Sequence, residues 1–217
     1  RKGAATADHS IDPNANVSGR DVITFNYEVP KAYMKLNSLY NLWLSLRDGF
    51  DEETADLAIK SEVDGLLYIN DSWDIGRPYC FNYSMYDIAL EGLKMGGRLN
   101  IVPAKSLATF LRQVEQFTVY AANSTLGATG LADLLIVASR YIDDILTTGY
   151  DNHVKIGKEE RVWTYVAEQL TSLIYTLNWE FRGNQSPFTN VSVYDDNFLA
   201  QLAPAYVIND KAPRIET

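Results

Sequence analysis

Apolar residues recur at intervals of three and four along much of the chain, which is the period that places them on one face of an α-helix. This pattern predicts four long helices, over residues 30–49, 106–123, 129–146 and 158–178. Pro30 suits the first position of the first helix, because the proline ring fixes a helical φ. Asp51 is the expected N-cap of a shorter helix that ends before Gly65.

Three other stretches have the composition or alternation of β-strands. They are residues 66–69, the residues around Cys80, and residues 188–194. Because predicted helices separate these strands, we expect a helix-rich α/β architecture with parallel strand pairing. In such architectures ligands bind at the carboxyl ends of the strands and in the loops beyond.

The helices predicted at residues 106–123 and 129–146 are joined by a glycine-containing turn at residues 127–130. A short connection between two long helices favours an antiparallel pair. The pair could equally form an oligomer interface, since tyrosines are enriched at interfaces. The tyrosines in question are Tyr120, Tyr141 and Tyr150.

The remaining segments carry weaker patterns. Residues 1–20 are polar and small and predict an extended lead-in, and residues 21–217 are expected to form one domain. Residues 195–217 predict a turn, a brief helix and a loose end. The glycines at residues 92–97 fit neither phosphate-loop spacing, so they predict an ordinary turn.

The formal net charge is -9 and the isoelectric point is near 4.7. Both values argue against nucleic acid and anionic membranes as partners, because long-range repulsion would oppose either contact. No apolar run reaches the roughly 18 residues that cross a bilayer, and the first residues lack a secretory signal, so we expect a cytoplasmic protein. His9, His153 and Cys80 lie far apart in the sequence, so we expect no metal site.

Cys80 is the only cysteine, so it cannot form a disulfide within the chain. The residues alone leave two roles open. Free cysteines often pack as small hydrophobic side chains, and packing between Tyr79 and Phe81 would explain this one. The alternative is a reactive thiol, which the polar strand signal near the end of the chain favours.

Five short segments stand out between residues 14 and 190. They are residues 14–17 (Asn-Ala-Asn-Val), 65–71 (Gly-Leu-Leu-Tyr-Ile-Asn-Asp), 92–96 (Gly-Leu-Lys-Met-Gly), 103–106 (Pro-Ala-Lys-Ser) and 183–190 (Gly-Asn-Gln-Ser-Pro-Phe-Thr-Asn). In this order and spacing, with Cys80 after the second segment, they resemble the catalytic subunit of anaerobic (class III) ribonucleoside-triphosphate reductase, a glycyl radical enzyme. Their common order makes the resemblance more specific than any one segment.

The resemblance implies a ten-stranded α/β barrel built from two five-stranded halves. This chain would supply its N-terminal part, with flanking helices and the first barrel strands. Cys80 matches the family's catalytic cysteine on the first barrel strand, which faces the 2′ position of the ribonucleotide and takes part in its reduction. Sulfur suits this role, because a thiol gives up a hydrogen atom or an electron more readily than a hydroxyl group does.

Other parts of the family pattern are missing from the sequence. It contains neither the second cysteine, which forms a thiyl radical and takes the 3′ hydrogen, nor the Arg-Val-x-Gly-Tyr motif of the glycyl radical, nor an ATP-binding cone. The resemblance therefore implies the N-terminal half of a split enzyme, or a fragment, that turns over nothing alone.

The same resemblance implies partners and cofactors. The chain itself carries no cofactor, and the glycyl radical, installed by a radical SAM activase, would lie on a complementary C-terminal chain or domain. A ribonucleoside triphosphate is the expected substrate, deoxyribonucleoside triphosphates or ATP are the expected effectors, and a homodimer is the expected assembly. The reductant, formate or a thioredoxin-like protein, is left open.

Four further residues are candidates for binding. Gln116, in the helix predicted at residues 106–123, falls where the family places a polar effector contact, although a solvated glutamine would look the same. Gln185, Ser186 and Asn190 lie in the family's polar bend and are candidates for the substrate cavity. A purely structural bend is the alternative, because a hydrogen-bonded polar turn needs no ligand.

Two other functions stay open at this point. One is another glycyl radical enzyme of the pyruvate formate-lyase kind, which shares the barrel. The other is a non-catalytic nucleotide-sensing or dimerisation module, in which the helix pair binds an effector and Cys80 contributes only to packing.

Overall fold

The computed structural model describes residues 22–69, 79–95, 99–125, 127–180, 186–208 and 210–213. Two compact units divide the chain. Residues 80–179 with 186–217 form the larger unit, and residues 1–79 with 180–185 form the smaller one. The lead-in predicted at residues 1–20 lies outside the described residues.

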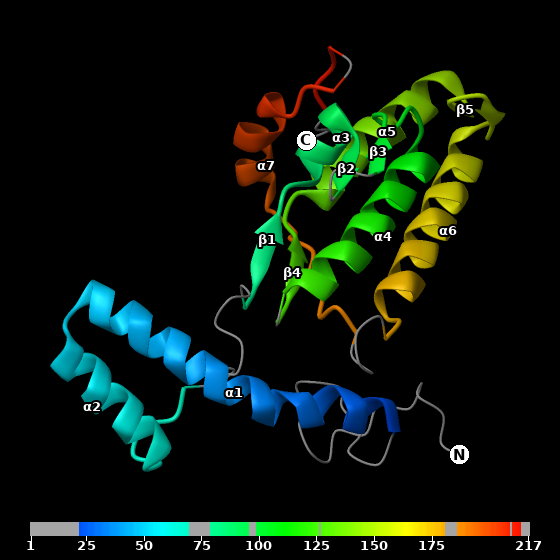
Figure 1. Cartoon of the computed structure of the whole chain (residues 1–217). Helices are drawn as coiled ribbons and strands as arrows, with labels where there is room; N and C mark the ends of the chain where they lie inside the picture. The colour runs from blue at the N-terminus through cyan, green and yellow to red at the C-terminus, as the bar shows by residue number, and fades with distance from the viewer. Residues whose placement is uncertain are drawn as a thin grey trace. The chain divides into compact units, whose positions relative to one another are not determined.

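The smaller unit is a helical hairpin of α1 (Val22–Gly49) and α2 (Glu52–Val63), shown in blue and cyan in Figure 1. The Asp51 carboxylate accepts a hydrogen bond from the Thr54 N–H at 2.7 Å, which confirms the predicted cap. Helix α2 ends before Gly65, as expected. Helix α1 begins at Val22, so the expectation that Pro30 occupies its first position is wrong.

The strand predicted at residues 66–69 is absent among the described residues of the smaller unit. The N–H groups of Leu66 and Leu67 both donate to the Ser61 carbonyl, at 2.8 and 3.0 Å. These donors therefore complete the end of α2, since the last carbonyls of a helix need partners from outside it. Leu66 and Leu67 form a bend, and Tyr68 and Ile69 have no regular secondary structure.

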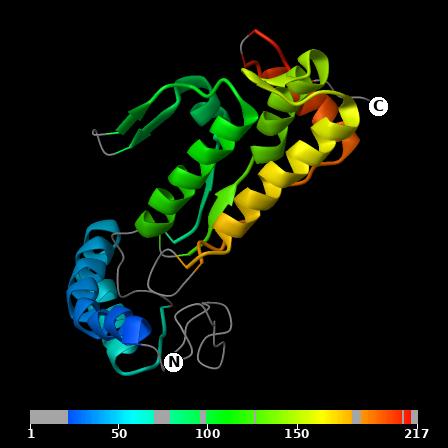
Figure 2. The same ribbon diagram turned by 90° about the vertical axis from the view of Figure 1, so that its right-hand side faces the viewer.

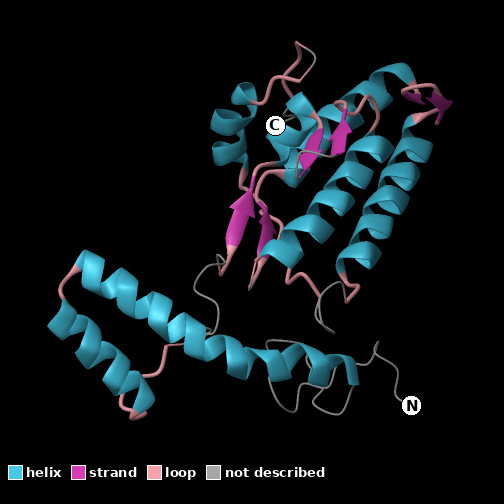
Figure 3. Cartoon of the chain, viewed as in Figure 1, coloured by secondary structure: helices cyan, strands magenta, loops and turns pink. Residues whose placement is uncertain are grey.

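The larger unit contains a short parallel sheet. Strand β1 (Phe81–Tyr83) pairs in parallel with β4 (Thr129–Leu131), with Asn82 opposite Gly130. A third segment runs along the other side of β4, where Leu131 and Val191 form a parallel bridge. The strand predicted at residues 188–194 does not form: Val191 makes only an isolated bridge, and no residue of this stretch belongs to a strand. Figure 3 shows β1 and β4 beside the helices of this unit.

Three long helices complete the larger unit: α4 (Leu107–Ser124), α5 (Leu134–Thr148) and α6 (Glu159–Leu177). Helices α4 and α6 lie side by side in both views (Figures 1 and 2). The core between the helices is apolar, and the rings of Phe110 and Tyr141 stack at 5.1 Å. Other fully buried members of this core are Leu107, Val114, Leu134, Val137, Val162 and Leu173.

Two of these helices match their predictions, and one does not. Helices α4 and α6 coincide with residues 106–123 and 158–178. The helix predicted at residues 129–146 begins only at Leu134, because residues 129–131 form β4. The N–H of Leu131 donates to the carbonyl of Asn190, a partner that a local pattern cannot reveal. Strand β4 therefore forms part of the connection between α4 and α5.

Asp151 fastens the start of α4 from a distant hairpin formed by β5 (Tyr150–Asp151) and β6 (Val154–Lys155). Its carboxylate accepts hydrogen bonds from the N–H groups of Leu107 and Ala108, at 2.8 and 3.2 Å. The Tyr165 hydroxyl donates to the same carboxylate at 2.6 Å. Burial, and then this hydrogen bond, raise the pKa of Tyr165.

Smaller elements surround the sheet. They are α3 (Met85–Glu91), β2 (Leu93–Met95), β3 (Leu99–Ile101), α7 (Asp196–Leu202) and the 3₁₀ turn η1 (Ala203–Ala205). Helix α7 is the brief helix expected within residues 195–217, whereas α3 was not predicted. Within the turn expected at residues 92–97, residues 93–95 form β2, which pairs antiparallel with β3, and residues 96–97 lie outside the described residues. The predicted helix-rich α/β class with parallel pairing is confirmed.

Among the helices that the structure describes, none combines the length and apolar character that a membrane crossing requires.

Candidate functional site

Cys80 directly precedes β1, and its side chain is exposed. The Ala128 N–H donates a hydrogen bond to Cys80 Sγ at 3.2 Å, and the Phe81 N–H donates to the Ala128 carbonyl at 3.0 Å. The thiol is thus held where β1 and β4 begin, outside the hydrophobic core. This exposure does not support the interpretation of Cys80 as a packing residue.

The two faces of β1 have different surroundings. The Tyr83 ring meets Phe117 of α4 edge to face, with centroids 4.9 Å apart, so this face is covered by helix. Successive side chains of a strand point to opposite faces. Asn82 therefore lies on the other face and is exposed, and Cys80, which directly precedes the strand, is exposed as well.

Asn82 and Asn190 meet over Gly130. A Cβ at position 130 would lie 1.8 Å from Asn82 Oδ1 and 2.6 Å from Asn190 Oδ1, whereas real Cβ atoms essentially never approach another atom within 3.0 Å. The two amide oxygens thus occupy the space that a side chain would need. Glycine at position 130 allows two asparagines from separate segments to converge beside the cysteine strand.

A bulge brings Asn190 to this position. The Thr129 N–H donates to the Pro187 carbonyl at 3.3 Å, and the Leu131 N–H donates to the Asn190 carbonyl at 2.9 Å. A regular parallel ladder would place the second acceptor at Thr189, so the segment contains one extra residue. Phe188 accommodates it with a φ of +49°, an uncommon conformation for a residue with a side chain. Bulges of this kind re-aim side chains and are frequent beside active sites.

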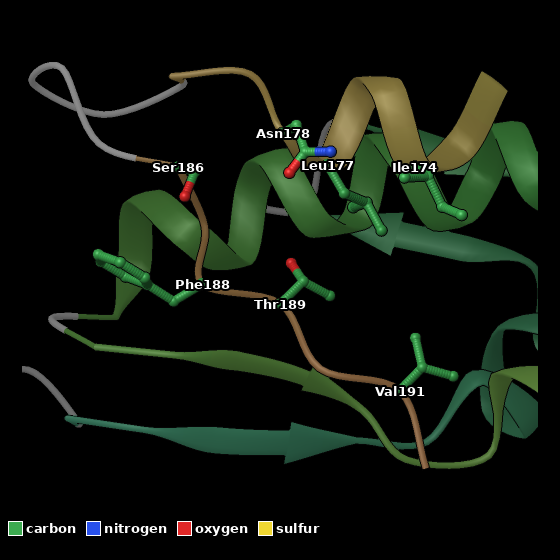
Figure 4. A pocket seen from close by; sticks show the side chains of 7 residues that line it. All are labelled: Ile174, Leu177, Asn178, Ser186, Phe188, Thr189 and Val191. Atoms are coloured by element: carbon green, nitrogen blue, oxygen red, sulfur yellow. The ribbon is translucent and has the colours of Figure 1, made fainter. Parts of the chain in front are cut away.

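Ser186 lies in a different place. It lines a cavity of about 240 Å³ between the end of α6 and the segment that follows (Figure 4). The other lining residues are Ile174, Leu177, Asn178, Phe188, Thr189 and Val191. The Oγ1 of Thr189 is buried and has no hydrogen-bond partner in the part of the chain that the structure describes. The structure therefore does not bring Ser186 together with Cys80 and Asn190.

Two other predicted residues do not join the asparagine pair. Gln116 is exposed on α4, the helix that covers the Tyr83 face of the sheet. Its neighbour Gln113 is buried and donates to the Val102 carbonyl at 2.8 Å. Gln185 lies outside the described residues.

The carboxyl ends of β1 and β4 are occupied by the protein's own polar groups. The buried Asp133 carboxylate accepts hydrogen bonds from the Met85 N–H at 2.6 Å and the Ser84 hydroxyl at 2.8 Å. Burial, followed by the charge of Asp133, raises the pKa of Tyr206 to about 12. The expectation that a ligand binds at the carboxyl ends does not fit Cys80, which lies at the amino end of its strand.

No group of three or more His, Cys, Asp and Glu side chains within the described ranges could hold a metal ion. The polar side chains that converge are the amides of Asn82 and Asn190, and the Cys80 thiol lies two residues before Asn82. These groups can hydrogen-bond a neutral polar ligand, and the thiol can in addition give up a hydrogen atom or an electron.

Asn82 is the residue of this group that the sequence analysis missed. The signal was present, because a residue two positions after Cys80 in a strand must share its face. The role of Gly130 carried no such signal, since the asparagines that use its missing side chain come from distant parts of the chain.

Comparison with known proteins gives one family. The family model described as anaerobic ribonucleoside-triphosphate reductase matches residues 44–208. Among curated proteins no match is found.

Solved structures of anaerobic ribonucleotide reductases are similar to the chain. For the Thermotoga maritima enzyme in complex with dATP and CTP, the identity is 29% and the TM-score 0.77, covering 88% of this chain and 31% of that chain. A second structure of the same enzyme, with dATP bound in the specificity site, has 29% identity and a TM-score of 0.77, and the match covers 88% of this chain and 32% of that chain. Another anaerobic ribonucleotide reductase has 28% identity and a TM-score of 0.78, with 89% and 30% covered. The chain thus spans about a third of the length of these enzymes.

Proposed function

Because the chain belongs to the anaerobic ribonucleoside-triphosphate reductase family, we propose that it supplies the N-terminal part of such an enzyme's catalytic barrel, including one catalytic cysteine. The fold similarity to about a third of a related reductase supports this assignment. The reaction would be the reduction of ribonucleoside triphosphates to deoxyribonucleoside triphosphates in the cytoplasm. The complete enzyme would need the remaining portion of the barrel.

The single observation that carries the proposal is the exposed Cys80 thiol at the start of β1, held by the Ala128 N–H. A thiol that takes part in ribose reduction must reach the substrate, which a core cysteine could not do. Cys80 would face the 2′ position and supply a hydrogen atom. The overall conversion consumes two electrons and two protons and releases the 2′ oxygen as water, so a reductant must afterwards restore the sulfur.

The described residues contribute binding and orientation. The Ala128 N–H holds Cys80 Sγ at 3.2 Å, which limits the directions in which the thiol can point. Asn190 is well placed to contact substrate near this thiol, because its amide meets that of Asn82 over Gly130. Ser186 would shape the cavity beside α6, and Gln185 stays a candidate from the family pattern alone.

The glycyl radical of the complementary C-terminal portion, installed by a radical SAM activase, would supply the one-electron chemistry that starts the reaction.

Effector binding would involve a different surface. Gln116 is exposed on α4, where a deoxynucleoside triphosphate or ATP could reach it. A similar reductase binds dATP in its specificity site, which supports an effector of this class. We place a homodimer contact on the same helices, α4 and α5.

Reconstitution tests the proposed function. The chain would be combined with the complementary portion, the activase and a reductant, and the conversion of CTP to dCTP would be followed. We expect product with native Cys80 and none above background with Cys80→Ser, while the chain alone produces nothing. Undiminished dCTP formation by the serine variant would remove Cys80 from the mechanism.

The non-catalytic module makes a different prediction. In that case nucleotide would bind to the native chain and to Cys80→Ser alike, and the reconstituted mixture would form no dCTP. The non-catalytic alternative requires Cys80 to be a packing residue, and the exposure of Cys80 disfavours it.

A further inference from the structure

We propose that Asn82 is a substrate-binding residue that, together with Asn190, hydrogen-bonds the ribose hydroxyl groups over Gly130 beside Cys80. This inference rests on the proposed function, because it takes a ribonucleotide as the ligand. It adds a contact on the cysteine strand itself and assigns a reason for glycine at position 130.

The geometry of the sheet brings Asn82 and Asn190 together. Asn82 and Gly130 are partners in the register of β1 and β4. The bulge at Phe188 brings Asn190 to the other side of the same glycine. Both amide oxygens therefore point into one small volume, at 1.8 and 2.6 Å from the position of the missing Cβ.

The hydrogen bonds that the two amides lack support their binding of a ligand hydroxyl. Neither the Asn82 nor the Asn190 side chain forms a hydrogen bond with another residue in the described ranges, and both residues are exposed. Two acceptor oxygens that converge attract a donor between them. A hydroxyl group is such a donor, and an amide can also give its N–H to a hydroxyl oxygen. Two neighbouring hydroxyls on a ribose match two neighbouring amides.

The poor packing of an asparagine within a strand also supports a binding role for Asn82. Asparagine is depleted in β-strands, where β-branched and aromatic residues pack better. Phe81 and Tyr83, on either side, follow that preference and form stacked rings 5.7 Å apart. Asn82 makes no corresponding contribution to packing, which fits selection for a ligand contact at that position.

The position of Asn82 relative to the Cys80 thiol indicates which part of the ligand it would bind. Cys80 directly precedes β1 and lies two residues before Asn82, which is about 6–7 Å along an extended chain. A ribose spanning the asparagine pair would therefore place a hydroxyl-bearing carbon near Cys80. Ribonucleotides would be recognised through the hydroxyl that reduction removes.

The test uses the complete reductase that contains this chain, without activation, so that binding is measured apart from turnover. Calorimetry would give the affinity for CTP, 2′-deoxy-CTP and 3′-deoxy-CTP. Loss of one hydrogen bond should weaken CTP binding of Asn82→Ala about 10-fold. Asn82→Ala and the native enzyme should have the same affinity for 2′-deoxy-CTP, because that analogue already lacks the hydroxyl that Asn82 is proposed to bind.

Two variants separate a contact from a folding defect. Asn82→Asp keeps the shape and the acceptor oxygen, which can still accept a hydrogen bond from a ribose hydroxyl, so it should bind CTP more tightly than Asn82→Ala. Asn100→Ala removes an exposed asparagine from β3, away from the site, and should bind all three nucleotides like the native enzyme.

The outcomes distinguish this inference from the proposed function. If both Asn82 variants bind CTP normally while Cys80→Ser abolishes reduction in the activated enzyme, the inference is overturned and the proposed function stands. If both variants lose affinity for CTP and both deoxy analogues equally, Asn82 does not read a hydroxyl and the inference is again overturned. If the activated native enzyme reduces no ribonucleotide, the proposed function fails and takes the inference with it.

Discussion

Ala128 donates its backbone N–H to the sulfur of Cys80, at 3.2 Å across the start of the β1–β4 pair. The contact joins two segments that are distant in sequence and gives an exposed thiol a defined direction. It also ties Cys80 to the strand that carries Gly130, so the orientation of the thiol and the meeting of the two asparagines depend on the same parallel pair.

The exposure of Cys80 is testable on the chain alone. A thiol-specific reagent should modify one thiol per chain under native conditions, at a rate within about tenfold of that of the urea-unfolded chain, because no core packing has to open first. Absorbance or intact mass would follow the modification. Modification that proceeds only after unfolding would show that Cys80 is buried and would favour the packing role.

Removal of the Asp133 carboxylate should destabilise the larger unit. Asp133→Ala leaves the Met85 N–H and the Ser84 hydroxyl without their acceptor, at a cost of about 1–3 kcal/mol in the free energy of unfolding. Urea denaturation would measure the loss. Asp133→Asn, which keeps one acceptor and the side-chain shape, should cost less. Equal stability of the alanine variant and the native chain would contradict the assigned hydrogen bonds.

A side chain at Gly92 should be poorly tolerated. Gly92 has a φ of +77°, and a Cβ there would lie 1.9 Å from the Ile101 carbonyl oxygen. Gly149 is the matched control, because its φ is +75° but its nearest contact to such a Cβ, the Gly157 oxygen, would be 3.1 Å away. Gly149→Ala should cost about 1 kcal/mol from backbone strain, and Gly92→Ala should cost clearly more. Equal losses in urea denaturation would mean that β3 moves aside freely.

Alkaline pH should unfold the larger unit. Burial raises the pKa of Tyr141 from 10.0 to about 12, so the folded state favours the neutral hydroxyl that donates to the Ala104 carbonyl at 3.2 Å. The stabilisation is fully present below pH 10 and is lost as the pH rises through 12, because only the unfolded chain ionises readily in that range.

Tyr141→Phe isolates this contribution. Between pH 10 and 12 the free energy of unfolding of the variant should fall less with pH than that of the native chain. Urea denaturation at a series of pH values would measure both. Exposed Tyr175→Phe is the control and should leave the slope unchanged. Parallel curves for the native chain and Tyr141→Phe would indicate that Tyr141 does not titrate differently in the folded state.

Local signals in the sequence determined much of the helical structure. Asp51 caps α2 as expected, because a capping side chain bonds N–H groups only two or three residues away. Helix α4 likewise begins next to Ser106, where the predicted helix starts. The apolar period of α6 sufficed for the same reason, since helix faces follow from neighbouring positions. The order of five short segments likewise indicated the family before any contact was known.

Only the tertiary structure decided strand β4 and the meeting of Asn82 with Asn190. Leu131 fits the apolar spacing of the helix that follows, yet residues 129–131 form β4. The N–H groups of Thr129 and Leu131 find carbonyl partners at Pro187 and Asn190. The same pairing brings Asn82 and Asn190 together over Gly130. Such partners are close in space but distant along the chain. The residue pattern of neither segment therefore indicates which backbone groups its own will bind.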